Sequence, residues 1–299
     1  MATETPAAVP VTTALPRRRS FLGALWRHRS SRVGLILVGF TLAVALIGPF
    51  LVLGSASSDP NHQDLSQSLL GSSSGHWLGT DDLGRDELVR IVNGARYTLV
   101  MAVAAVAIAA AAGLVVGAVS GYAGGWTDLV IQRLVDIILS FPGFLMALSL
   151  VAILGTGMTN LIIAVAVSAF PRFVRVTRSG VLTVMRLPYV EAARSQGLPP
   201  LRILRRHVVP NALGALIVQT PLEIGSAVLT GAGLGFLGLG VAEPTPEWGA
   251  MLGDGRDLLF TDPTLVTYPG IAIFVAILGF NLLGDGIRDV LDPRHSTSR

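Results

Sequence analysis

The chain has 299 residues, of which 51% are hydrophobic and 14% are charged, and its mean hydropathy is +0.64. Soluble domains carry about 25% charged residues, so this composition favours a bundle of membrane helices over a water-soluble domain. The chain contains no Cys, which excludes a disulfide framework and a thiol nucleophile. All 22 residues counted as Lys or Arg are Arg, so the chain lacks the lysine of a P-loop nucleotide site.

The N-terminal segment, residues 1–32, is expected to be cytoplasmic, and its Ala-, Thr- and Pro-rich first 16 residues are predicted to be disordered. Arg17–Arg19 followed by an apolar run resembles a twin-arginine export signal, with the GSAS after the run as a candidate cleavage site. The hydrophobic region of a signal peptide has about 7–15 residues, whereas Val33–Leu53 is longer. We therefore favour an uncleaved first transmembrane helix.

Six apolar runs predict six transmembrane helices, because a hydrocarbon core of ~30 Å needs about 20 mostly apolar residues. The third run contains Arg133 and Asp136, whose spacing predicts a mutual ion pair. In the sixth run Asn281 and Asp285 share a helix face, which predicts hydrogen bonds between helices. The runs are Val33–Leu53, Tyr97–Tyr122, Asp128–Leu154, Asn160–Phe173, Leu213–Gly240 and Thr267–Ile287.

The distribution of Arg orients these helices, because cytoplasmic loops of membrane proteins carry an excess of positive charge. With the N-terminus inside, seventeen Arg fall in the segments 1–32, 172–206 and 288–299, and four fall in the outer loops. This predicts both termini in the cytoplasm, an outer loop at 54–96, a five-helix core at 97–287 with a cytoplasmic loop at 174–212, and a cytoplasmic tail at 288–299. The same Arg bias explains the isoelectric point of about 9.9 without a nucleic-acid partner.

The outer loop contains His76, Asp81 and Asp82, which are residue types that bind metals. The sequence GTDDLGRD around them is more typical of a turn followed by a helix that one of the two Asp residues caps. We therefore predict no metal site. The WGAMLGDGRDLLF segment predicts a short helix at the membrane interface, anchored by Trp248.

The cytoplasmic loop contains the polar segment YVEAARSQGLPPLRILRRHVVPNAL, residues 189–213. Its first part consists of good helix formers and pairs Glu191 with Arg194 at i, i+3. Gly197 interrupts the helix and Pro199–Pro200 starts another, which is expected to end before Pro210. On physical grounds alone, this loop could dock on another protein or lie against anionic lipid headgroups.

The spacing of Glu191, Ala192, Ala193, Gly197 and Pro210 resembles the EAA motif of ABC importer permeases, although His207 stands where that motif has Ile. The segments HWLGTDDLGRDELVRIVNGARYTL, PTPEWGAML and FNLLGDGIRDVLDPR resemble permeases of the dipeptide, oligopeptide and nickel group. The resemblance covers about residues 20–295 and implies a C-type permease subunit with the type I importer fold, all-α with six transmembrane helices. It implies that the loop is a coupling helix; the residues carried over are Glu191, Ala192, Ala193, Arg194 and Gly197.

One departure from the family concerns the fifth apolar run. Family members have a Glu before the FLGLG segment, where this chain has Gly231, and this chain has Glu223 about two helical turns earlier. An intramembrane carboxylate usually faces a cavity or a partner. Glu223, together with Asn281, is therefore a candidate for the substrate path, meeting a peptide ammonium group; the alternative is a structural pair with an Arg.

The resemblance further implies the partners and the mechanism. These are a second homologous permease, two ATPase subunits or domains that bind ATP and Mg, and an extracytoplasmic substrate-binding protein. The chain itself would hold no cofactor and be no enzyme. It would lie in the cytoplasmic (inner) membrane of a bacterium and import di- or oligopeptides by alternating access. The residues predicted to dock the binding protein are Asp81, Asp82, Arg85, Trp248 and Arg256.

Three alternatives stay open at this point. The cargo could be nickel, glutathione or a haem-like ligand instead of a peptide. A secondary transporter would need no ATPase and would show inverted repeats, and none is visible in the sequence. A membrane-embedded enzyme would need convergent polar groups within the helices, but all five His residues lie outside the six runs.

Overall fold

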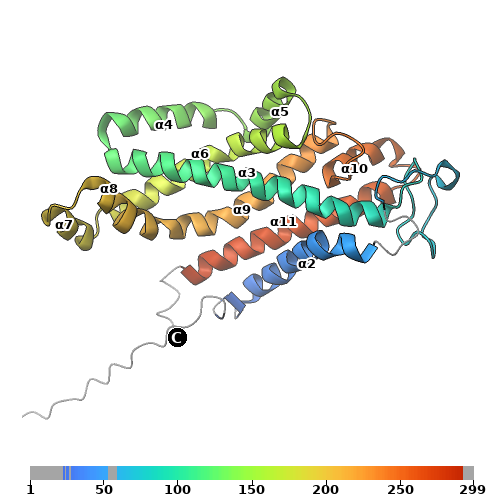
Figure 1. Ribbon diagram of the computed structural model, residues 1–299, viewed down its shortest axis with the longest axis horizontal. Coiled ribbons are helices and arrows are strands. Elements are labelled where there is room, and N and C mark those ends of the chain that lie inside the picture. The colour runs from blue at the N-terminus through green and yellow to red at the C-terminus, as the bar shows by residue number, and fades with distance from the viewer. Residues whose placement is uncertain (1–22, 24, 27, 53–58, 292–299) are drawn as a thin grey trace, which may run out of the picture.

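The computed structural model describes residues 23, 25, 26, 28–52 and 59–291, and these form a helical bundle without a β-sheet (Figure 1). The predictions for residues 1–22, for the GSAS segment and for residues 292–299 lie outside the described residues. The helices are α2 (Arg29–Leu51), α3 (Glu87–Ala123), α4 (Gly125–Leu139), α5 (Gly143–Leu154), α6 (Met158–Val184), α7 (Pro188–Ser195), α8 (Pro200–Ile203), α9 (Val209–Phe236), α10 (Trp248–Gly255) and α11 (Thr264–Leu291).

The described part of the chain has five helices that are long and apolar enough to cross a membrane, and six crossings if the bent pair of α4 and α5 forms one. The other five are α2, α3, α6, the run Pro200–Phe236 and α11. The prediction of an all-α membrane protein with six spans is confirmed. The prediction of one continuous third helix is wrong, because the axes of α4 and α5 meet at 84°. Pro142 lies between them, with non-helical backbone angles and no N–H to continue α4.

Two helices extend beyond their predicted ends. α3 begins at Glu87, ten residues before the expected start at Tyr97. α6 continues past Phe173 and through Pro171 to Val184. Arg172, Arg175 and Arg178 therefore all lie within α6, which corrects the predicted end of the fourth helix at Phe173.

α3 and α6 pack along each other at the centre of the bundle, and small residues on α3 make this possible. A Cβ atom on Gly113 would lie 2.4 Å from the Cβ of Phe173, and one on Gly117 would lie 2.6 Å from the backbone oxygen of Val174. Spacing of four residues puts these glycines on one helix face, so the two backbones come into direct contact. The main hydrophobic core forms around this contact and includes residues of α3, α6 and α9.

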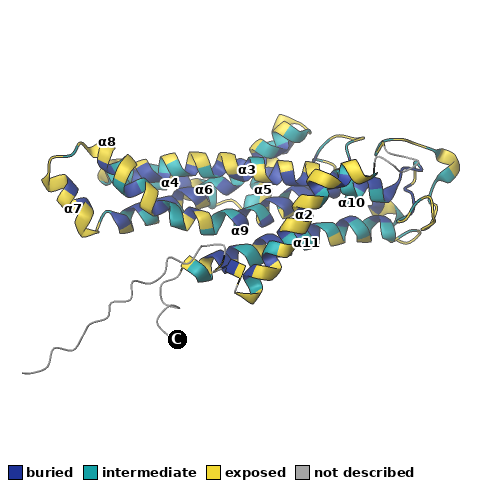
Figure 2. Ribbon diagram, turned by 60° about the horizontal axis from the view of Figure 1, so that its bottom comes forward, coloured by how far each residue is buried: buried dark blue, intermediate teal, exposed yellow. Residues whose placement is uncertain are grey.

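The two ends of the bundle differ. α7 and α8 lie at one end, and α10 with residues 59–86 lies at the other, in both views (Figures 1 and 2). α2 and α11 pack as a pair, with Gly34 against the backbone of Leu283. α2 begins and α11 ends toward the end of the molecule that carries α7.

Candidate functional site

The segment predicted to couple to a partner forms the short helix α7 and a sharp turn after it. Leu187 precedes α7 with extended backbone angles, and Pro188 occupies its first turn, where the missing N–H costs nothing. At its C-terminus the N–H of Gly197 donates to the Arg194 oxygen and the N–H of Leu198 to the Ala193 oxygen. This is a Schellman motif, and Gly197 has the positive φ of +75° that the motif requires.

α7 is attached to the bundle by one apolar face. Val190 is fully buried and Ala193 is 6% exposed, in a cluster with residues of α3, α6 and the start of α9. Glu191, Ala192 and Arg194 are exposed on the rest of the helix (Figure 2). Of the coupling residues implied by the resemblance, Ala193 offers no surface to a partner, because the chain's own bundle covers it.

The helix after the turn is longer than predicted. α8 begins at Pro200, as expected, but it does not end before Pro210. It continues through a π-helical turn, Leu204–Val208, into α9. Pro210 lies in the first turn after this π-helical turn, a position at which proline is tolerated. Consequently α8, the π-helical turn and α9 form one helical run, and the loop itself is short.

The carboxylate of Glu223 on α9 has a partner on α6. Arg172 Nη1 lies 2.9 Å from Glu223 Oε2, and Gln219 Nε2 donates to Glu223 Oε1 at 2.8 Å. Glu223 is 4% exposed, whereas the Arg172 side chain is 48% exposed. The predicted alternative of a structural pair with an Arg is therefore what the structure shows.

Two more arginines of α6 pair with α4. Arg175 Nη2 lies 2.7 Å from Asp136 Oδ1, and Arg178 donates two hydrogen bonds of 2.6 Å to the carboxylate of Asp128. The predicted pair of Arg133 with Asp136 is wrong, because α4 presents Asp136 to α6. Sequence reasoning missed this ladder; its signal is the spacing of three residues between Arg172, Arg175 and Arg178, which puts them along one side of α6.

Asn281 does not make the predicted hydrogen bond between helices. It is exposed on α11, and its Oδ1 would lie 3.2 Å from a Cβ on Gly225 of α9. Asp285 is exposed as well. Neither side chain has a hydrogen-bond partner among the described residues, so both are open to a group from outside the chain.

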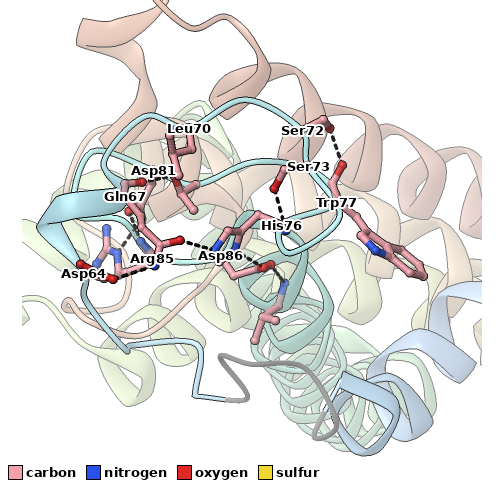
Figure 3. Close-up of polar contacts among 12 residues, drawn as sticks. Asp64, Gln67, Leu70, Ser72, Ser73, His76, Trp77, Asp81, Arg85 and Asp86 are labelled. Atoms are coloured by element: carbon pink, nitrogen blue, oxygen red, sulfur yellow. Dashed lines mark hydrogen bonds and ion pairs between the residues drawn. The ribbon is translucent and has the colours of Figure 1, made fainter.

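At the opposite end, residues 59–86 fold around buried charges (Figure 3). Arg85 Nε lies 2.5 Å from Asp81 Oδ2, and both side chains are nearly inaccessible. His76 lies between Asp86 and Gln67, at 2.8 Å from an oxygen of each. Asp86 also accepts a hydrogen bond from the Val89 N–H at 2.9 Å and so caps α3. The prediction that Asp81 or Asp82 caps this helix is wrong.

A second buried carboxylate joins α10 to α3. Glu247 is fully buried; its Oε1 accepts a hydrogen bond from Thr98 at 2.9 Å and its Oε2 accepts one from the Ala250 N–H at 3.0 Å. Burial raises the pKa of Glu247, because the charged form is poorly solvated there. Sequence reasoning missed Glu247; its position directly before α10, typical of a helix cap, is the signal that could have found it.

Asp254, on α10, is a third perturbed acid at this end. Burial, and then the nearby carboxylate of Glu243, raise its pKa to about 6. Arg90 Nη2 lies 3.8 Å from Asp254 Oδ2 and opposes this shift. Asp254 is 30% exposed, so it is less completely buried than Glu247 at the same end of the bundle.

The residues predicted to dock a binding protein fall into two groups. Asp81, Arg85 and Trp248 are buried, and Trp248 Nε1 donates to the Ile91 oxygen at 2.9 Å. They support the α10 end of the bundle and offer no surface to a partner, so the prediction stays only for the exposed Asp82 and Arg256. Among the described residues, no group of three His, Asp or Glu side chains is arranged to hold a metal ion.

Comparison with known proteins agrees with this arrangement. A family model described as "binding-protein-dependent transport system inner membrane component" matches residues 113–297. The dipeptide transport system permease protein DppC of Alkalihalophilus pseudofirmus is 42% identical over 284 residues, which is 95% of this chain and 91% of that protein. The glutathione transport system permease protein GsiD of Pectobacterium atrosepticum is 39% identical over 279 residues, 93% and 91% of the two chains.

A solved structure supports the fold independently. The inward-facing MetNI methionine ABC transporter matches with a TM-score of 0.57 at 21% identity, over 68% of this chain and 97% of that one. The fold and these relatives define the membrane-spanning permease of an ABC importer. The chain belongs to the family of binding-protein-dependent transport system inner membrane components.

Proposed function

We propose that this chain is one of two permeases of an importer for short peptides, and that α7 is the helix by which separate ATPase subunits move it. The observation that carries the proposal is the division of α7 into a buried face, Val190 and Ala193, and an exposed face, Glu191 and Arg194. An apolar face and a charged face are common to surface helices. What favours docking is that the exposed charges, Glu191 and Arg194, belong to the segment that resembles the EAA motif.

The partners follow from the family. A second homologous permease completes the path, two ATPase subunits bind ATP and Mg²⁺, and an extracytoplasmic binding protein delivers the cargo. The chain itself does no covalent chemistry. Binding of ATP favours one of two arrangements of the permease pair and hydrolysis restores the other.

The cargo is a peptide in this proposal. Two relatives with broad coverage are named for transport of a dipeptide and of glutathione, which is itself a small peptide. These names favour peptides over nickel or haem-like ligands. The polar side chains on α6 and α9 fit a hydrophilic cargo.

In the membrane, α7 and both termini lie on the cytoplasmic side and α10 lies outside. The absence of Cys makes this testable with single-cysteine variants. Ser195→Cys, beside the turn after α7, is expected to react with an impermeant thiol reagent only from the cytoplasmic side, and Ser74→Cys in the outer loop only from outside. The reverse labelling would contradict this orientation.

The experiment that tests the function is purification of the tagged chain in mild detergent from cells that express its neighbouring genes. We expect a second permease and P-loop ATPase subunits to co-purify, with ATPase activity that Glu191→Ala reduces. Asp257→Ala, which removes a carboxylate that is 85% exposed at the other end, is the matched control and should change nothing. Recovery of the chain alone, stable and without ATPase subunits, would overturn the proposal in favour of a secondary transporter.

A further inference from the structure

The ion pair between α6 and α9 presents a positive charge to its surroundings. Glu223 is almost fully buried and is held by two donors, whereas half of the Arg172 side chain is exposed. The sequence suggested that Glu223 meets the ammonium group of a substrate. The structure reverses this: the exposed member of the pair is a guanidinium, and its natural ligand is a carboxylate.

Arg172 is far inside the bundle. It lies 14 residues along α6 from Met158, or ~21 Å at 1.5 Å per residue. Glu223 lies 13 residues from Phe236, the other end of α9, which is ~20 Å. With Met158 and Phe236 taken as the membrane boundary, the pair is about two-thirds of the way across a ~30 Å hydrocarbon core. At this depth an arginine facing lipid is costly, so its exposed side is expected to face a water-filled path.

A groove begins one helical turn from Arg172, at Arg175, and extends toward α7. It has a volume of about 500 Å³; its polar lining residues are Arg175, Ser179, Thr183 and Asn211, and the rest of its lining is small or apolar. A second hollow of about 420 Å³ shares Ser179 and Thr183 with it and adds Arg178 and Arg186. Each volume is above the ~300 Å³ at which sites for small ligands begin.

The charges around this groove leave a surplus of hydrogen-bond donors. Each of Asp128, Asp136 and Glu223 already accepts from one arginine of α6. Arg172 donates only its Nη1 to Glu223 among the described residues, and a guanidinium has five N–H groups. Arg175, Arg178 and Arg186 line the two hollows, and Arg172 lies one turn beyond Arg175 on α6. Four arginines therefore stand against three carboxylates.

We propose that Arg172, with Arg175 one turn nearer to α7, is the site that binds the carboxylate of a peptide during its passage through the bundle. Arg172 keeps its position by the bond to Glu223 and uses its free N–H groups on the substrate. This inference rests on the proposed function, because it assumes that the groove is part of the substrate path.

The first test measures the charge of the groove and needs no transport. Ser179→Cys, in the assembled importer in detergent, is treated with an anionic and with a cationic methanethiosulfonate reagent. We expect the anionic reagent to react faster than the cationic reagent, after each rate is divided by the rate of the same reagent with a free thiol. Arg172→Met should reduce this preference about fivefold, the effect of a ~1 kcal/mol interaction, and Arg172→Lys should retain it. Ser74→Cys in the outer loop is the control and should not respond.

The second test uses the ligand. A dipeptide with a free carboxylate should slow the labelling of Ser179→Cys, and the same dipeptide as its C-terminal amide should not. Arg172→Met should abolish the protection. In proteoliposomes with saturating loaded binding protein, Arg172→Met should reduce the uptake of the free-acid dipeptide at least tenfold. The uptake of the amide should change little.

The outcomes separate the two proposals. Equal loss of both peptides, or a reagent preference that Arg172→Met does not change, would show that the ion pair is only structural and would overturn the inference while leaving the importer intact. If the ATPase subunits do not co-purify, the proposed function fails, and the reagent preference is then measured on the purified chain alone, where it still shows whether the groove attracts anions.

Discussion

The two ends of the bundle use charged residues in opposite ways. At the α10 end, Asp81, Arg85, Asp86 and Glu247 are buried and bonded to one another, to Thr98 or to backbone N–H groups. At the α7 end, Glu191 and Arg194 are exposed. The α10 end is held by polar contacts and α7 by an apolar contact surface. Buried charges make the α10 end depend on a fixed geometry, whereas exposed charges leave α7 free to match another surface.

The same substitution, Glu to Ala, made at each end is the most direct test of this difference between the ends. Glu247→Ala leaves the Thr98 hydroxyl and the Ala250 N–H without their acceptor in a fully buried site. We expect it to lower the free energy of unfolding by about 2–4 kcal/mol. Glu191→Ala should leave stability within about 0.5 kcal/mol of the parent. Thermal unfolding in detergent measures both; equal losses would show that the ends do not differ.

The turn after α7 gives the next largest effect. No atom lies within 4 Å of a Cβ placed on Gly197, so a substitution there meets only the strain of its positive φ. That strain is about 1–2 kcal/mol for a β-branched residue and much smaller for Asn. Gly197→Val should therefore displace α7 and lower peptide-stimulated ATPase activity, and Gly197→Asn should retain it. Similar activity in the two variants would remove the turn from the coupling mechanism.

The stability of the α10 end should also respond to pH. Since burial raises the pKa of Asp254 to about 6, the neutral form is favoured in the folded chain. Its contribution to stability is complete below the ordinary pKa of 3.8 and is lost as the pH rises through about 6. Partial exposure reduces the effect to about 1 kcal/mol. Asp254→Asn should flatten unfolding curves measured between pH 4 and 7, and Asp257→Asn should not.

The smallest effect is expected at Arg133. Because Asp136 pairs with Arg175, removal of the exposed Arg133 breaks no ion pair among the described residues. Arg133→Ala should change the unfolding free energy by less than about 0.5 kcal/mol, and Arg175→Ala by more. If Arg133→Ala lowered the unfolding free energy more than Arg175→Ala does, the result would support the Arg133–Asp136 pair predicted from the sequence.

The sequence predicted what depends on local spacing. The six apolar runs, the turn at Gly197 and the start of a helix at Pro200 all follow from hydropathy and from the backbone restrictions of Gly and Pro. The partner of Asp136 could not be predicted, because Arg133 and Arg175 are both in reach until the packing of α4 on α6 is known. The burial of Arg85 and Trp248 depends in the same way on how distant segments meet.

The glycines of α3 have a mechanical consequence. With Gly113 and Gly117 in backbone contact with α6, no flexible side chains separate the two helices, so neither can slide or tilt without the other. α7 is seated against this pair through Val190 and Ala193. When α7 is displaced by a few ångströms, we therefore expect α6 to move with it as a rigid body. Arg172, which lies on α6, would then be displaced by a similar distance.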